Sequence, residues 1–171
     1  MLLISFYTFK FHIKARTINL HNLDRQTQTL VRNVIGNAQI TQLQTSHKWL
    51  INRTEFHSKF YDMKNIQNNY SVQFQLNNEI HYGNILNFIT INGIVFCQIE
   101  KFTCTEFNFR CKFNNIAVRN AFANIHKFFI KYVVSNDIVL IDSANIKKKC
   151  ILMKIENDCI LSPCCYLEEH D

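Results

Sequence analysis

The sequence predicts a mainly β protein: a small barrel or sandwich of about six to seven short antiparallel strands, with a partly helical or irregular N-terminal arm. Short apolar runs rich in Ile, Val, Phe and Tyr recur from residue 70 onward, and turn signals containing Asn or Asp separate them. Gly (3) and Pro (1) are scarce, which is typical of an ordered chain, and 47% hydrophobic residues can fill a core.

The N-terminal part contains one strand pattern and one helix pattern. Phe9 to Arg16 alternate between an apolar face and a face of Lys, His and Arg, which is the period of a half-buried strand. Asp24 can cap the start of a helix and Gly36 can end it. Between them the apolar stripe consists of Leu30, Val31, Val34 and Ile35. We therefore expect an arm at residues 1–56 and a β-domain at residues 57–171.

The β-domain is expected to be a series of strands joined by tight turns. Strands are expected at Tyr70–Leu76, Ile80–Ile91, Gly93–Phe102, Ile125–Val134, Ile138–Ile141, Cys150–Ile155 and Cys159–Leu161. Turns are expected at 77–78, 92–93, 114–115, 135–137 and 156–158, and a turn or a single helical turn at 143–149. Asn92-Gly93 is the strongest hairpin signal of the chain. A helix from Val118 to Tyr132 is the competing interpretation of the fourth strand.

One glycine and one apolar face define the expected core. Gly83 stands inside a strand pattern, which indicates a β-bulge or a close approach of another backbone. The side chains expected in the core around it are Tyr70, Val72, Phe74, Ile85 and Phe88.

Three segments carry a resemblance to a known family: HSKFYDMKNIQNNYSVQF (57–74), HYGNILNFI (81–89) and IDSANIKKKCILMKIENDCILSPCCYLEEHD (141–171). They resemble a β-rich accessory region near the C-terminus of proteins encoded by, or derived from, CACTA-like DNA transposons. That region reads S-x-x-Y, N-x-Y-x-V-x-Y and (F/Y)-G-x-I-x-x-F, then I-x-x-K-C-V, and ends near P-N-x-x-E-x-D. The matching residues are Ser58, Tyr61, Asn69, Tyr70, Val72, Phe74, Tyr82, Gly83, Ile85, Phe88, Ile146, Lys149, Cys150, Ile151, Pro163, Glu168 or Glu169, and Asp171.

The resemblance covers roughly residues 53–171. The chain departs from the family pattern at Cys164, where Asn is expected, and at Asp62, where the family tends to be basic. The resemblance implies a compact β-domain, similar to the chromatin-associated BAH-like barrels, that accompanies a catalytic domain and has no activity of its own.

The charge balance points to an anionic partner. A net charge of +6 and a pI near 9.0 are compatible with nucleic acid as that partner. The candidate binding residues are Lys10, His12, Lys14, Arg16, Lys147, Lys148 and Lys149. The first four form a stripe roughly 13–14 Å long on one strand face, and such stripes bind phosphates with little sequence specificity. The competing interpretation is that the strand lysines prevent edge pairing and that the lysine triplet is a solvated turn.

The cysteines predict neither disulfides nor a metal site. Seven cysteines form an odd set without a repeated short spacing, so we expect reduced thiols in a nuclear or cytoplasmic compartment. Cys97 and Cys150 lie in strand patterns and are expected in the core. The one cluster worth considering for zinc is Cys159, Cys164, Cys165 and His170. It contains no C-x-x-C or H-x-x-x-H pair, so we predict no metal and no cofactor.

No complete active site is recognisable. Asp142 ends an apolar strand, where metal-binding carboxylates are often found, but the partner carboxylates of a two-metal site are missing from the pattern, and we expect Asp142 to cap a turn. No strand-to-helix nucleophile elbow accompanies any Cys or Ser, and three scattered glycines cannot form a phosphate loop. The N-terminal run MLLISFYTF is shorter than the roughly 20 residues of a membrane span, so we expect no membrane segment.

These observations favour a non-catalytic accessory domain of a transposon-derived protein. We expect it to bind DNA or chromatin without strong sequence specificity, in the company of other transposon-derived proteins, and to have no small-molecule substrate. The alternatives are a protein-interaction or scaffold module and a transposon remnant without function.

Overall fold

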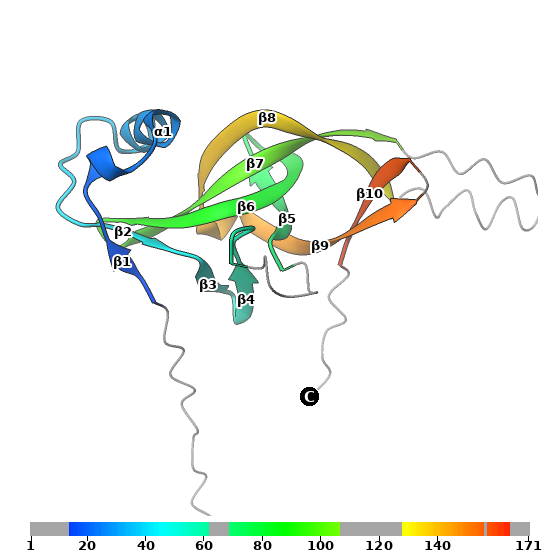
Figure 1. Cartoon of the computed structure of the whole chain (residues 1–171), viewed down its shortest axis with the longest axis horizontal. Helices are drawn as coiled ribbons and strands as arrows, with labels where there is room; N and C mark the ends of the chain where they lie inside the picture. The colour runs from blue at the N-terminus through cyan, green and yellow to red at the C-terminus, as the bar shows by residue number, and fades with distance from the viewer. Residues whose placement is uncertain (1–13, 62–68, 107–127, 156, 165–171) are drawn as a thin grey trace, which may run out of the picture.

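The computed structural model describes residues 14–61, 69–106, 128–155 and 157–164, and it confirms a mainly β fold (Figure 1). This part of the chain contains a single α-helix, α1 (Arg25–Ile35). The strands are β1 (Arg16–Thr17), β2 (Leu43–Ser46), β3 (Lys48–Ile51), β4 (Thr54–His57), β5 (Ser71–Leu76), β6 (Glu79–Ile91), β7 (Ile94–Glu106), β8 (Ile130–Asp142), β9 (Ile146–Ile155) and β10 (Asp158–Pro163).

Six of the strands close into an antiparallel barrel. The hydrogen-bonded order is β6-β5-β9-β10-β8-β7, and β7 pairs with β6 again, so the ring is partly closed. The β8–β10 pairing is short and joins Lys131 to Ile160 and Ile130 to Leu161. The strands β6, β7 and β8 are 13 residues long, which is more than the sequence patterns indicate. Because they are long, these strands can bend at a register shift and pair with more than one neighbouring strand.

The N-terminal segment extends this barrel. β2 pairs with the C-terminal half of β6, and β1 pairs with β2. β3 and β4 form a separate two-stranded hairpin. The expected division at 56/57 falls inside β4, and backbone hydrogen bonds join the N-terminal residues to the barrel. Figure 1 shows α1 along the upper margin, and β1 and the β3–β4 hairpin along the lower margin.

The predicted helix and its cap are confirmed. Asp24 is the N-cap of α1 and accepts a hydrogen bond from the Thr27 amide at 2.9 Å, and Gly36 ends the helix. Val31 is buried, whereas Val34 at the edge of the predicted stripe is exposed. A second polar contact joins α1 to the sheet: the Gln98 side-chain amide on β7 donates a hydrogen bond to the Thr27 hydroxyl at 2.7 Å.

Gly83 confirms the predicted close approach. A Cβ atom at this position would lie 2.4 Å from the carbonyl oxygen of Glu100 and 2.6 Å from Cγ2 of Ile99, so no other residue fits without a shift of the β7 backbone. Val72, Phe74, Ile85 and Phe88 are buried as expected, whereas Tyr70, also expected in the core, is only half-buried. The buried residues of this cluster fill the barrel. They are Val72, Phe74, Ile85, Phe88, Cys97, Ile99, Ile141 and Ile146, together with Ile51 and Phe56 of the hairpin.

One expected turn is strand instead, and another is shorter than expected. The segment 135–137 lies within β8, where the Ser135 hydroxyl donates to the carbonyl of Lys101 and accepts from the Asp137 amide, so the turn-like residues produce a register shift and not a chain reversal. The expected turn at 143–149 is limited to a 3-10 turn at Ser143–Asn145, and β9 starts at Ile146. The expected strand at Phe9 and the turn at 114–115 lie outside the described residues.

Candidate nucleic-acid interface

The predicted lysine triplet lies on β9, which is a strand of the barrel wall. Lys149 is in register with Val72, and Lys148 is in register with Gln73, so these two side chains leave opposite faces of the sheet. The Lys149 ammonium lies 5.4 Å from the centre of the Phe56 ring and donates to Asn69 Oδ1 at 3.2 Å. Lys149 therefore has a structural role, which is to join β9 to the β3–β4 hairpin.

Lys147 is placed by a β-bulge. The register between β5 and β9 shifts between Gln73 and Phe74, whose partners are Lys148 and Ile146, so Lys147 is the extra residue. A bulge bends the strand and re-aims the side chain beside it. Lys147 is exposed and lines an open groove of about 270 Å³. The other lining residues of the groove are Ile51, Asn52, Thr54, Phe56 and Ile146.

The β3–β4 hairpin forms the opposite wall of this groove. Its turn is Asn52-Arg53, and both residues have left-handed backbone angles (φ 48° and 64°), as the common two-residue hairpin turn requires. Sequence reasoning missed this hairpin because Arg replaces the usual Gly at the second turn position. The available signal was Asn52, which tolerates the left-handed region better than most residues.

The hairpin is amphipathic. One face carries Ile51 and Phe56, which are buried against the barrel interior. The other face carries Lys48 and His57, which are direct cross-strand partners. The hairpin thus packs its apolar face against the barrel interior. On the other face Lys48 is partly exposed, whereas His57 is buried.

The negative charge of Glu55 is balanced by two basic side chains of the hairpin. Its Oε1 lies 2.7 Å from Lys48 Nζ and 2.6 Å from His57 Nε2. Burial alone would raise the pKa of Glu55, but the hydrogen bonds and charges of Lys48 and His57 outweigh it and hold the pKa below its ordinary value of 4.5. The carboxylate is therefore ionised at neutral pH, and the two basic side chains hold it in place.

The segment after β4 is pinned to the barrel. The Lys59 amide donates to the carbonyl of Ile85 at 2.7 Å, and the Lys59 ammonium lies 2.9 Å from Oε2 of Glu100. The Tyr61 amide donates to the Ser58 carbonyl at 3.0 Å. Between these anchors the Phe60 side chain is 58% exposed.

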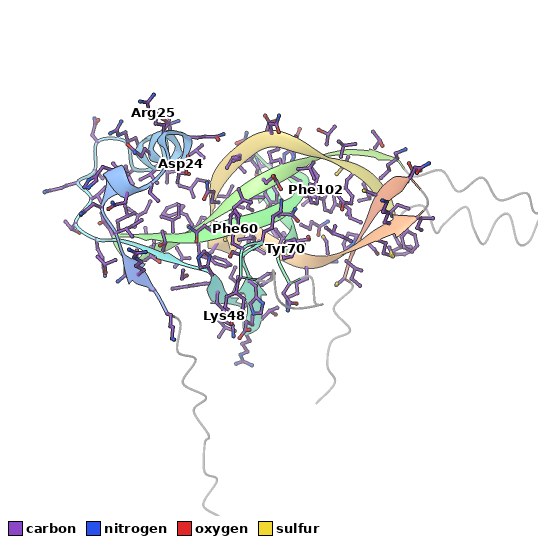
Figure 2. All side chains as sticks on the ribbon, viewed as in Figure 1. Asp24, Arg25, Lys48, Phe60, Tyr70 and Phe102 are labelled. Carbon is purple, nitrogen blue, oxygen red and sulfur yellow. The ribbon has the colours of Figure 1, made fainter. Side chains whose placement is uncertain are left out.

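We call Lys48, Arg53, Phe60, Tyr61 and Lys147 the hairpin surface. Figure 2 shows Lys48 and Phe60 at and just above the hairpin, and Arg25 on α1 at the opposite margin of the molecule. In the described part of the chain, Arg53 and Lys147 form no ion pair, and the nearby carboxylates Glu55 and Glu100 are already bound to lysines. The hairpin surface therefore combines the unpaired charges of Arg53 and Lys147 with the exposed aromatic rings of Phe60 and Tyr61.

The predicted N-terminal stripe is only partly visible. Lys10 and His12 lie outside the described residues, and Lys14 and Arg16 are exposed. Arg16 belongs to β1, a two-residue strand at the edge of the sheet, and it borders an open cleft of about 520 Å³. In Figure 1 β1 lies along the same margin of the molecule as the hairpin, and β2 runs between them.

The other candidate residues have structural positions. Asp142 caps the turn that follows β8, where its Oδ1 accepts from the Ala144 amide at 2.8 Å, as expected. Cys97 and Cys150 are buried, and burial raises the pKa of Cys150 to about 12, which keeps its thiol protonated. Cys159 and Cys164 lie at opposite ends of β10, roughly 16 Å apart along the strand, so they cannot share one tetrahedral zinc ion.

Cys165 and His170 lie outside the described residues. Within the described ranges, no group of three or more His, Cys, Asp or Glu side chains is arranged to hold a metal ion. No helix in those ranges is both long and apolar enough to cross a membrane.

Comparisons with protein-family models, with curated proteins and with solved structures found no match for the chain.

Proposed function

We propose that the protein is a non-catalytic β-barrel module that binds nucleic acid through the hairpin surface, as an accessory domain of a transposon-derived protein. The observation that carries this proposal is the groove between the hairpin and β9. Lys147 on β9 lines this groove, and Arg53 lies at the hairpin tip between Asn52 and Thr54, which line it from the other side. Among the described residues neither cation has an ion-pair partner. Such cations bind phosphates and release counterions, which makes the affinity salt-dependent.

The apolar floor of the groove is part of the barrel core, because Ile51, Phe56 and Ile146 are buried. The two cations are therefore held on a rigid scaffold, which lowers the entropic cost of binding. The module would read the phosphate backbone and not base sequence. DNA or chromatin in the nucleus is the partner that fits both this chemistry and the family resemblance.

The test is fluorescence anisotropy with labelled oligonucleotides across a salt series. We expect the double variant Arg53→Ala/Lys147→Ala to reduce the slope of log K against log salt by about 2, because each lost phosphate contact removes about 1. The charge-matched control is Arg25→Ala/Arg32→Ala on α1, which should leave the slope unchanged. Lys14→Ala/Arg16→Ala should have a smaller effect than the hairpin variant.

Absence of binding by the wild-type protein at low salt would contradict the proposal. Equal losses in the hairpin and α1 variants would also contradict it, because the effect would then come from net charge and not from the hairpin surface.

A protein-interaction module is the second candidate function, and a specific observation favours it. β10 lies between β8 and β9, and these flanking strands carry the exposed apolar side chains of Val133, Ile151 and Ile155. Exposed apolar patches often mark protein interfaces. If no nucleic acid binds, this function becomes the better explanation of the exposed surface.

A further inference from the structure

Phe60 is exposed although the residues around it are firmly anchored. The Ser58 side chain is fully buried, and its amide donates to the His47 carbonyl at 2.8 Å. Lys59 is fixed by its backbone to β6 and by its ammonium to Glu100 on β7. The ring of Phe60 is therefore presented to solvent on a short segment with little backbone freedom, and ordering it upon binding costs little entropy.

The next residue, Tyr61, carries a second aromatic ring, which has its own neighbours. The rings of Tyr61 and His57 are 4.7 Å apart between centroids, and the Lys48 ammonium lies 5.9 Å from the Tyr61 centroid. The contact with His57 fixes the orientation of the Tyr61 ring, which is itself 44% exposed. The Lys48 ammonium is paired with Glu55 at 2.7 Å, so the unpaired cations of the hairpin surface among the described residues are Arg53 and Lys147.

Exposed aromatic rings next to backbone-binding cations suit single strands better than duplexes. In a single strand the faces of the bases are accessible, and each base can stack on a ring whatever its identity. In a duplex the bases are stacked on each other, and a protein must unstack them before a ring can reach a face. Phosphate-binding cations alone would not distinguish the two forms.

We propose that the protein prefers single-stranded nucleic acid, with one unpaired base stacked on Phe60 and phosphates of the same strand bound by Arg53 and Lys147. This inference rests on the proposed function and names its substrate class. Because stacking does not depend on the sugar, the same surface accepts single strands of DNA and of RNA.

The experiment compares four labelled probes of equal length: single-stranded DNA, single-stranded RNA, the DNA duplex and the RNA duplex. We expect the full chain to bind both single strands at least about tenfold more tightly than the duplexes, and Phe60→Ala to weaken single-strand binding about tenfold without changing duplex binding. Phe60→Trp should restore it. The control is Val133→Ala, which removes another exposed apolar side chain from a different strand.

The outcomes separate this inference from the proposed function. Equal affinity for single strands and duplexes, with no effect of Phe60→Ala, would overturn the single-strand preference and leave nucleic-acid binding intact. A preference for one sugar alone would overturn the base-stacking explanation, because 2′-hydroxyl contacts would then decide the affinity. Failure of all four probes to bind would overturn both proposals.

Discussion

The two basic regions predicted from the sequence differ in how the fold supports them. In the described residues, the N-terminal region has Arg16 on a two-residue edge strand. The hairpin region has Lys147 on a barrel strand beside a hairpin whose inner face is part of the core. We expect the hairpin region to bind nucleic acid more tightly than the N-terminal region, because its charges are held on a more rigid support. What distinguishes the hairpin region is charge from distant segments gathered on one rigid scaffold.

The largest expected effect concerns the barrel that holds the hairpin region. Gly83→Ala should lower the free energy of unfolding by about 3 kcal/mol, because its Cβ would overlap the Glu100 carbonyl oxygen and the β7 backbone would have to move. Urea denaturation of the purified variant measures this loss.

The matched control for this substitution is Gly93→Ala in the β6–β7 turn. Nothing lies within 4 Å of a Cβ built there, so only the left-handed backbone (φ 86°) resists the change, and the cost should be about 1 kcal/mol. Equal losses in the two variants would show that the close approach at Gly83 is not what constrains the barrel.

A smaller effect is expected in the N-terminal region. Asp24→Ala removes the N-cap of α1 and should lower the free energy of unfolding by about 1 kcal/mol. Nucleic-acid binding should stay at the wild-type level, because α1 lies on the opposite margin from the hairpin (Figure 2). Asp24→Asn, which can still accept the Thr27 hydrogen bond, should recover most of the stability. A loss of binding in Asp24→Ala would show that the two regions are coupled.

The smallest effect concerns the charges within the hairpin. The folded-state pKa of Glu55 is lowered, so its contribution to stability is complete above about pH 4.5 and is lost as the pH falls through the folded-state value. Glu55→Gln should therefore be less stable than the wild type by about 0.5 kcal/mol at pH 7, and the difference should shrink below pH 4.5. Thermal melts across this pH range measure the difference.

Glu79→Gln at the start of β6 is the control, because the Glu79 carboxylate is well exposed and lies 3.8 Å from the basic side chain of His81. A pH dependence that is the same in both variants would contradict the specific role of Glu55.

Much of the barrel could be predicted from the sequence because its strands carry local signals. The turns at Asn77-Asn78 and Asn92-Gly93 and the cap at Asp24 depend on residues a few positions apart. The β3–β4 hairpin was missed because its turn uses Arg53 in place of Gly. Strand lengths were underestimated because Ser135 and Asp137 resemble turn residues even where their hydrogen bonds keep β8 extended.

The candidate site was less predictable than the fold, and the reason is its topology. Lys147 was recognised as basic, but its exposure depends on a bulge set by pairing with β5. Arg53 and Phe60 carry no pattern of their own. Their significance arises from the docking of the hairpin on the barrel and from the anchoring of Lys59 to β6 and β7. Contacts between residues far apart in the chain produce no local sequence pattern, so a single sequence does not predict them.

The most direct test of the central claim is NMR chemical-shift mapping of the isotope-labelled protein during titration with a single-stranded oligonucleotide. The account predicts that the largest shifts occur at residues 48–61 and 147–149, with Phe60 among the strongest, and that α1 is unaffected. Shifts concentrated on α1 or on the exposed side chains of β8, or no shifts at all, would contradict the claim that the hairpin surface binds nucleic acid.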